Sequence, residues 1–172
     1  MKNSTEQNQA LSPKILGLAI KSEIEAVSAY TKLHDRVKNA LLKKKLTFLI
    51  SEETKHRKIL EKLFSQKYPT QEVNLPDRSF LPPIRLQVDP EPPIRDLFKA
   101  ALQAEKLSEA FYKKRSQEVK DTESRKLLEY LSRVERSHYF MIKSEIDLLE
   151  KFPEYYDVEE FHFSHEMVHL GP

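Results

Sequence analysis

Apolar residues recur every three or four positions in four stretches of this chain, which is the period of a helix with one buried face. The helices predicted from them span about residues 13–38, 39–66, 94–119 and 122–151. Ser12 and Pro13 are typical of a helix start, as N-cap and first helical residue. Asp121 or Thr122 is expected to cap the last helix. The pattern therefore predicts an all-α protein.

A segment rich in proline separates the second predicted helix from the third. The seven prolines within residues 68–93 exclude a long helix there and predict an extended crossover. Its apolar residues, expected to pack on the helices, are Phe80, Leu81, Ile84 and Leu86. Two helical hairpins joined by one long crossover describe a single four-helix bundle over residues 12–152.

The two ends of the chain differ from the bundle. Residues 1–11 are mostly polar, and we expect them to be disordered. Residues 153–172 are rich in aromatic side chains and histidine, and we expect this C-terminal tail to dock on the helices.

Composition narrows the class of protein. Two glycines and 33% charged residues suit long helices with solvated faces rather than a sheet full of tight turns. A net charge of +2, with both signs interspersed, argues against a nucleic-acid partner. No apolar run approaches the ~20 residues of a membrane span, and the N-terminus lacks the apolar region of a signal peptide. We therefore expect a cytoplasmic protein with no membrane partner.

Acidic and histidine residues interrupt the apolar face of every predicted helix. The first and third helices carry one glutamate there, and the second and fourth carry a glutamate followed three residues later by a histidine. These residues are Glu23, Glu53, His56, Glu105, Glu135 and His138. Because residues three apart on a helix are neighbours, each glutamate–histidine pair can reach one point in space.

Shifting the sequence by 82 residues aligns its two halves. The chemically informative matches are Glu23 with Glu105, Tyr30 with Tyr112, Glu53 with Glu135 and His56 with His138. Eleven of 42 ungapped positions are identical between residues 19–60 and 101–142, where chance would give roughly three. The hairpins therefore read as copies of one unit that face each other across a pseudo-twofold axis.

Four carboxylates directed into one core need counter-charge. Burying them ionised and unpaired would cost far more than the ~5–15 kcal/mol net stability of a domain. No lysine or arginine recurs at matching inward positions, so we expect two divalent cations. Oxygen and imidazole ligands suit iron or manganese, and this residue pattern is that of di-iron carboxylate bundles.

Eight residues are expected to take three roles in such a centre. The ligands expected to bridge the ions are Glu53 and Glu135. The residues expected to hold one ion each are Glu23 with His56 and Glu105 with His138. The residues expected to donate hydrogen bonds to the carboxylates from just outside the ligands are Tyr30 and Tyr112.

A single glutamate–histidine pair at this spacing is weak support for a metal site. The same spacing occurs at Glu159/His162 and Glu166/His169, where no matching upstream glutamate and tyrosine exist. Only the repetition at equal offsets favours a metal centre over surface ion pairs. For His162, His165 and His169, packing of the tail and a role near a metal both stay open.

Four stretches resemble the rubrerythrin-like branch of the ferritin-like superfamily, over about residues 14–151. They read AIKSEIEAVSAY, ISEETKHRKILEKL, ALQAEKLSEAFY and LSRVERSHYFMIKSEI. The resemblance implies a ferritin-like bundle whose six ligands hold two iron ions, with manganese possible in their place. It also implies a reaction with hydrogen peroxide or dioxygen, and a homodimer.

Departures from the family pattern qualify these expectations. The chain has no cysteine for a rubredoxin domain, so electrons must come from an external donor protein. Ser108 and His138 stand where many rubrerythrins have glutamate, which resembles the six-ligand site of bacterioferritins. Glu52 stands where bacterioferritins carry their haem-binding methionine, so no haem is expected.

Three functions fit this sequence. The leading hypothesis is an oxidoreductase that reduces peroxide or oxygen at a di-metal centre. The first alternative is a ferroxidase or an iron storage or buffering protein, which the bacterioferritin-like ligands suggest. The second is a non-catalytic metal-binding scaffold that recruits a partner. Oxidation of an organic substrate also stays open.

Overall fold

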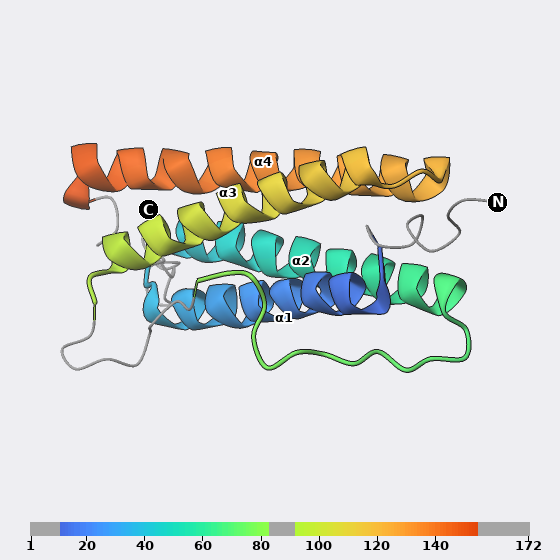
Figure 1. Cartoon of the computed structure of the whole chain (residues 1–172). Coiled ribbons are helices and arrows are strands. Elements are labelled where there is room, and N and C mark those ends of the chain that lie inside the picture. Colours follow the sequence, from blue (N-terminus) through green and yellow to red (C-terminus); the bar gives the residue numbers. More distant parts are fainter. Residues whose placement is uncertain (1–10, 83–91, 155–172) are drawn as a thin grey trace, which may run out of the picture.

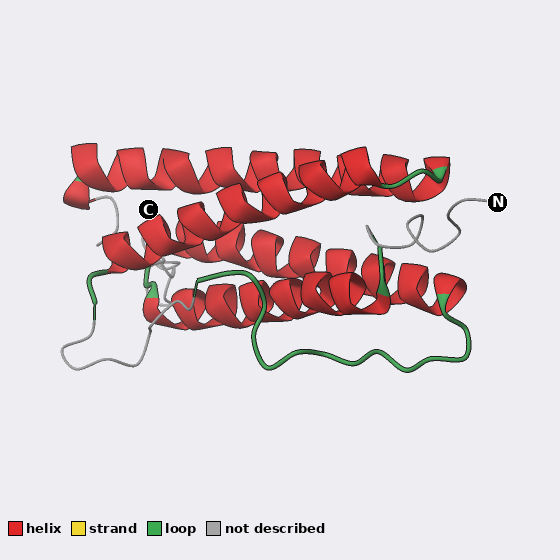
Figure 2. Cartoon of the chain, in the orientation of Figure 1, coloured by secondary structure: helices red, strands yellow, loops and turns green. Residues whose placement is uncertain are grey.

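The computed structural model describes residues 11–82 and 92–154, which form four α-helices. They are α1 (Pro13–Arg36), α2 (Ala40–Lys67), α3 (Ile94–Glu118) and α4 (Thr122–Lys151). Figure 1 shows them as two antiparallel hairpins, α1 with α2 and α3 with α4, lying one against the other. The described residues contain no strand, as Figure 2 shows. The expected four-helix bundle is confirmed, and each helix ends within two residues of its predicted limits.

Side-chain caps explain where three of the helices begin. Ser12, Asn39 and Asp121 each accept a hydrogen bond from the backbone N–H three residues further on, which satisfies a donor that a helix start leaves free. Asp121, rather than Thr122, is therefore the cap of α4. Pro93 precedes α3 without a side-chain cap.

Two apolar clusters fill the bundle, one toward each end. One packs the start of α1 against the end of α2 and includes Leu16, Leu60 and Tyr112. The other packs the end of α1 against the start of α2 and includes Tyr30 and Leu46. A fully buried leucine contributes about 1.5–3 kcal/mol to stability. Between the clusters, each helix carries the polar residues that interrupt its apolar face.

The crossover is tied to both hairpins. After α2, residues 68–82 of the crossover run back along α1 (Figure 1, green). The Glu25 carboxylate of α1 accepts hydrogen bonds from the hydroxyl of Ser79, at 2.5 Å, and from its backbone N–H. The ring of Phe80 stacks on Phe111 of α3, with centroids 4.2 Å apart. The predicted packing of the crossover on the helices is therefore seen for Phe80.

The crossover also touches the first turns of α1. A Cβ atom on Gly17 would lie 2.6 Å from the backbone carbonyl oxygen of Asn74. Only a glycine at this position allows the two backbones to approach so closely. Gly17 therefore fixes how near to α1 the crossover can run.

The N-terminal boundary needs one correction. Leu11 is only 4% exposed, lies in the first apolar cluster, and accepts a hydrogen bond from Tyr68 through its carbonyl oxygen. Assigning it to a disordered N-terminus was therefore wrong. Residues 1–10, the crossover residues Ile84 and Leu86, and residues 155–172 of the C-terminal tail, which hold its three histidines, lie outside the described residues.

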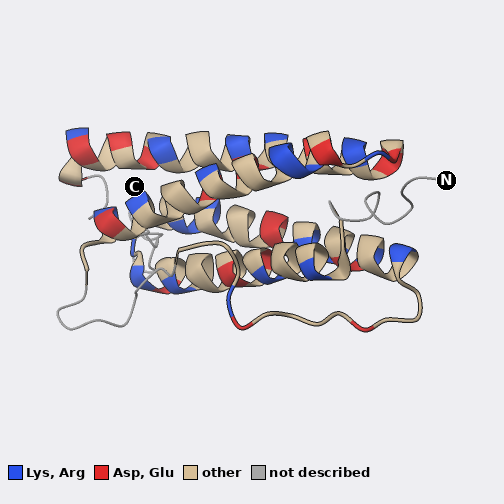
Figure 3. Cartoon of the chain, in the orientation of Figure 1, with Lys and Arg blue, Asp and Glu red and all other residues tan. Residues whose placement is uncertain are grey.

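The surface of the bundle carries charged residues of both signs, as the composition predicted. Lysine and arginine are interspersed with aspartate and glutamate along all four helices (Figure 3). Within the described ranges, none of the helices is both long and apolar enough to cross a bilayer.

Candidate metal centre

All six residues expected as ligands meet in the layer between the apolar clusters. Their side chains are 1–3% exposed. Two groups form, in each of which one ligand atom per residue lies within 4.8 Å of the others. The groups are Glu23, Glu53, His56 and Glu135, and Glu53, Glu105, Glu135 and His138. Only two residues, Glu53 and Glu135, belong to both groups.

The first group is centred on the Nδ1 atom of His56. This atom lies 3.0 Å from Oε2 of Glu53, 3.1 Å from Oε1 of Glu135 and 3.5 Å from Oε2 of Glu23. Three helices, α1, α2 and α4, therefore supply oxygen atoms around one imidazole nitrogen.

The second group repeats this arrangement around the Nδ1 atom of His138. That atom lies 2.9 Å from Oε1 of Glu53, 3.6 Å from Oε2 of Glu105 and 3.9 Å from Oε2 of Glu135. The two imidazole rings stack with centroids 5.7 Å apart and an interplanar angle of 21°. Glu53 and Glu135 thus each direct one oxygen to each histidine, whereas Glu23 and Glu105 each reach one histidine.

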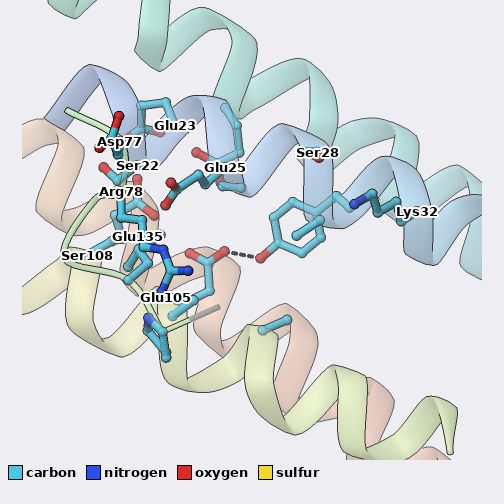
Figure 4. Close-up of a pocket in the computed structure, with 18 residues that line it drawn as sticks. Ser22, Glu23, Glu25, Ser28, Lys32, Asp77, Arg78, Glu105, Ser108 and Glu135 are labelled. Carbon is cyan, nitrogen blue, oxygen red and sulfur yellow. Dashed lines mark hydrogen bonds between the residues drawn. The ribbon is translucent and has the colours of Figure 1, made fainter. Parts of the chain in front are cut away.

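The two core tyrosines hold the unshared glutamates, and they do so across the hairpins. Tyr112 of α3 donates a hydrogen bond to Oε1 of Glu23 on α1. Tyr30 of α1 donates to Oε1 of Glu105 on α3, the dashed line in Figure 4. Burial and the nearby carboxylates raise the pKa of both phenols well above the usual value, so both remain donors.

Burial and mutual repulsion control the charge of the carboxylates. Burial, together with the charge of Glu53, raises the pKa of Glu23 to about 8. Burial and the charges of Glu53 and Glu105 raise the pKa of Glu135 in the same direction. Burial also opposes ionisation of Glu53, but the close approach of the His138 and His56 imidazoles outweighs it and holds its pKa well below the usual value.

The carboxylates around the two histidines raise the pKa of both imidazoles. Burial alone would lower the pKa of His138, but the nearby carboxylates of Glu105 and Glu53 raise it to about 9. Burial likewise opposes a charge on His56, yet Glu135, Glu23 and Glu53 raise its pKa far above the usual value. Without metal, protons on these groups therefore supply the positive charge that the buried carboxylates need.

The donor atoms fit a pair of metal ions. Six buried atoms of the centre lack a well-directed hydrogen bond within the described part of the chain. They are Oε1 of Glu53, Oε2 of Glu105, Oε1 of Glu135, Nε2 of His56, and Nδ1 and Nε2 of His138. A buried group left without a partner costs ~1–3 kcal/mol, and a cation would satisfy the oxygens and the Nδ1 atom. Carboxylate and imidazole donors suit iron or manganese.

A pocket of about 330 Å³ opens onto the carboxylate side of the centre, between α1 and α3 (Figure 4). The four glutamates line its buried end, and neither histidine does. The crossover contributes Asp77, Arg78, Leu81 and Pro82 to its wall. The sequence patterns gave no sign of this pocket, because the crossover has no periodicity from which its path could be predicted.

Four helices around buried carboxylates and histidines define a ferritin-like bundle with a candidate di-metal centre. The rubrerythrin family model matches residues 14–146. The chain therefore belongs to the rubrerythrin family, and the resemblance seen in the sequence is confirmed.

Two solved structures are similar to this chain. A hypothetical protein from Pyrococcus furiosus is 35% identical, with a TM-score of 0.73 over 87% of this chain and 92% of that one. A ferritin-like, diiron-carboxylate protein from Bacillus anthracis str. Ames is 19% identical, with a TM-score of 0.65 over 84% and 99%. At this identity the second likeness shows the fold alone. A search of curated proteins found no match.

Proposed function

We propose that this chain binds two iron ions and reduces hydrogen peroxide or dioxygen with electrons from an external donor protein. The main support for the proposal is that Glu53 and Glu135 each direct one oxygen to each histidine. Two adjacent ions with common ligands require this arrangement. Membership of the rubrerythrin family favours iron. The pocket would admit the oxidant to the carboxylate side.

Each residue has a distinct part in this proposal. Glu53 and Glu135 would bridge the ions, Glu23 with His56 would hold one, and Glu105 with His138 the other. A bound iron pair supplies two electrons and a Lewis acid at one place. The chain's own residues neutralise the ions, release the protons of the raised-pKa carboxyl groups as ions bind, and exclude water through the two apolar clusters.

Replacement of a shared ligand tests the proposal. Glu53→Ala removes one oxygen from each half of the centre, so we expect lost iron and, in step, at least a tenfold lower rate of hydrogen peroxide consumption. Elemental analysis and peroxide assays on the same samples measure both. The matched control is Glu52→Ala, which removes the neighbouring carboxylate that pairs with Lys55 at the surface. Full turnover by metal-free protein would rule the proposal out.

A crystal grown with iron gives a direct test of the centre. Two anomalous-scattering peaks about 3.5–4 Å apart are expected between the helices. A single peak, or peaks outside the six side chains, would contradict the assignment of the ligands.

Iron oxidation for storage or buffering is a second candidate, because the two halves offer identical ligand sets, as a ferroxidase site would. Storage requires a closed shell of subunits, whereas the leading proposal includes a homodimer in the cytoplasm. Size-exclusion chromatography separates shell from dimer. Release of ferric iron after oxidation would favour the second candidate, and retention of both ions through repeated turnover would favour the first.

A further inference from the structure

The pocket above the carboxylates is larger than hydrogen peroxide or dioxygen requires. Its volume of about 330 Å³ falls within the ~300–1,000 Å³ typical of pockets that bind small organic molecules. A water molecule, only slightly smaller than hydrogen peroxide, needs about 10–15 Å³ of a cavity. The space therefore suits a reactant with a carbon skeleton.

Six apolar side chains, four of them alanines, line part of the pocket. They come from both helices and from the crossover, and they are Ala26, Ala29, Ala101, Ala104, Leu81 and Pro82. Alanine leaves room where a larger side chain would fill the gap between α1 and α3, and none of these side chains offers a hydrogen bond. This part of the pocket would therefore bind an apolar group, beside the buried carboxylates.

The roof of the pocket is held in place by contacts on both sides. Ser79, on the crossover, bonds to Glu25 of α1, and the adjacent Phe80 stacks on Phe111 of α3. The neighbouring Arg78 lines the pocket, on the same side as Glu105 and Glu135 (Figure 4). These two contacts attach the crossover wall of the pocket to α1 and to α3.

We infer that the reactant at this centre is a small organic hydroperoxide, with its apolar body between α1 and α3 and its O–O group at the carboxylates. The inference rests on the proposed function and names its substrate class. ROOH, two electrons and two protons give ROH and water. The O–O bond breaks, the distal oxygen leaves as water, and the other oxygen stays on carbon as the alcohol.

Comparison of two peroxides tests the inference. The reduced, iron-loaded protein is mixed without oxygen with cumene hydroperoxide or with hydrogen peroxide, and oxidation of the iron is followed. We expect kcat/KM for cumene hydroperoxide to exceed that for hydrogen peroxide at least tenfold, with one 2-phenyl-2-propanol formed per two irons oxidised. Equal or higher kcat/KM for hydrogen peroxide overturns the inference and leaves the proposed function standing. If neither peroxide is reduced, the proposed function fails too.

Replacing two different alanines by leucine tests whether the preference for the organic hydroperoxide depends on the pocket. Ala29→Leu places a larger side chain in the lining of the pocket and is expected to lower the ratio of the two kcat/KM values at least tenfold. Ala110→Leu makes the same change on the exposed face of α3, outside the pocket, and should keep the wild-type ratio. Equal ratios in the two variants would contradict the inference.

Binding of the product gives a readout that does not depend on turnover. 2-Phenyl-2-propanol should raise the Tm of the oxidised, iron-loaded wild-type protein in a dose-dependent way, since a ligand that binds only the folded state stabilises it. Ala110→Leu should respond in the same way, and Ala29→Leu should not. An unchanged Tm of the wild-type protein at saturating alcohol would overturn the inference even if Ala29→Leu failed to fold.

Discussion

The phenol of Tyr112 donates to one oxygen of Glu23, while the other oxygen of this carboxylate faces His56. Tyr30 and Glu105 repeat the arrangement beside His138. Each tyrosine therefore leaves one oxygen of its glutamate directed at the centre. In a metal site, partners of this kind orient the ligand and tune its affinity.

Removal of one phenol hydroxyl should weaken the centre without altering the fold. Tyr112→Phe is expected to lower affinity for Fe²⁺ or Mn²⁺ by about 10–100-fold, with helix content unchanged, because only a hydrogen bond to Glu23 is lost. Metal titration followed by calorimetry measures it. Tyr130→Phe, at a position that is 49% exposed on α4, is the control. Unaltered affinity in Tyr112→Phe would show that the phenol does not position the ligand.

The candidate ligands could be predicted from the sequence, but the pairing of tyrosines with glutamates could not. Spacing along a helix shows that Glu23 and Tyr30 share a face, and the repeat shows that Glu105 and Tyr112 do likewise. The spacing of residues along one helix does not show which other helix its tyrosine will face. The crossed bonds depend on how closely α1 and α3 pack, which only the structure reveals.

Among the elements, the helices could be predicted and the path of the crossover could not. The spacing of apolar residues shows which face of a helix is buried, and the capping residues show where the helix begins. Proline excludes a helix from the crossover, but it leaves the direction of an extended segment open. The stacking of Phe80 on Phe111 and the bond of Ser79 to Glu25 set that direction, and neither has a signature in the sequence.

The close approach of the crossover to α1 makes Gly17 sensitive to a single methyl group. Gly17→Ala gains about 1 kcal/mol in helix propensity, but its Cβ would meet a backbone oxygen at 2.6 Å. Overpacking of this kind costs about 1–3 kcal/mol, and a backbone carbonyl cannot rotate away as a side chain can. We therefore expect a net loss of stability.

Thermal unfolding of Gly17→Ala measures this loss as a lower Tm. Thr31→Ala, an exposed change on the same helix that also gains helix propensity, is the control and should leave Tm unchanged or slightly raised. A Tm of Gly17→Ala above that of the wild-type protein would mean that the crossover does not press on α1.

For the whole molecule, the shifted pKa values predict that metal-free protein becomes less stable as pH rises from about 5 to 9. Glu23 ionises near 4.5 when unfolded but near 8 when folded, so rising pH favours the unfolded state between these values. Glu135 acts in the same direction. His138 stabilises the fold fully below 6.5, and this contribution is lost as pH rises through about 9. Glu53, with its lowered pKa, contributes constantly above 4.5.

Chemical denaturation at pH 6 and pH 9 checks this dependence. The free energy of unfolding of metal-free protein should be lower at pH 9. Added Fe²⁺ or Mn²⁺ under anaerobic conditions should stabilise the protein more at pH 9 than at pH 6, because cations and protons compete for the same atoms. Stability that is flat or rising with pH in the metal-free protein would contradict the buried-charge account.

The internal repeat has a consequence for assembly. Neither hairpin contains all the residues of the centre. The tyrosine of each hairpin donates its hydrogen bond to a glutamate of the other hairpin. The shared glutamate of each hairpin likewise contacts the histidine of the other hairpin. Local helix formation alone can therefore produce no intact ion-binding cage. Uptake of a full complement of ions would report that the halves have docked, and so serves as a gauge of tertiary structure independent of helical content.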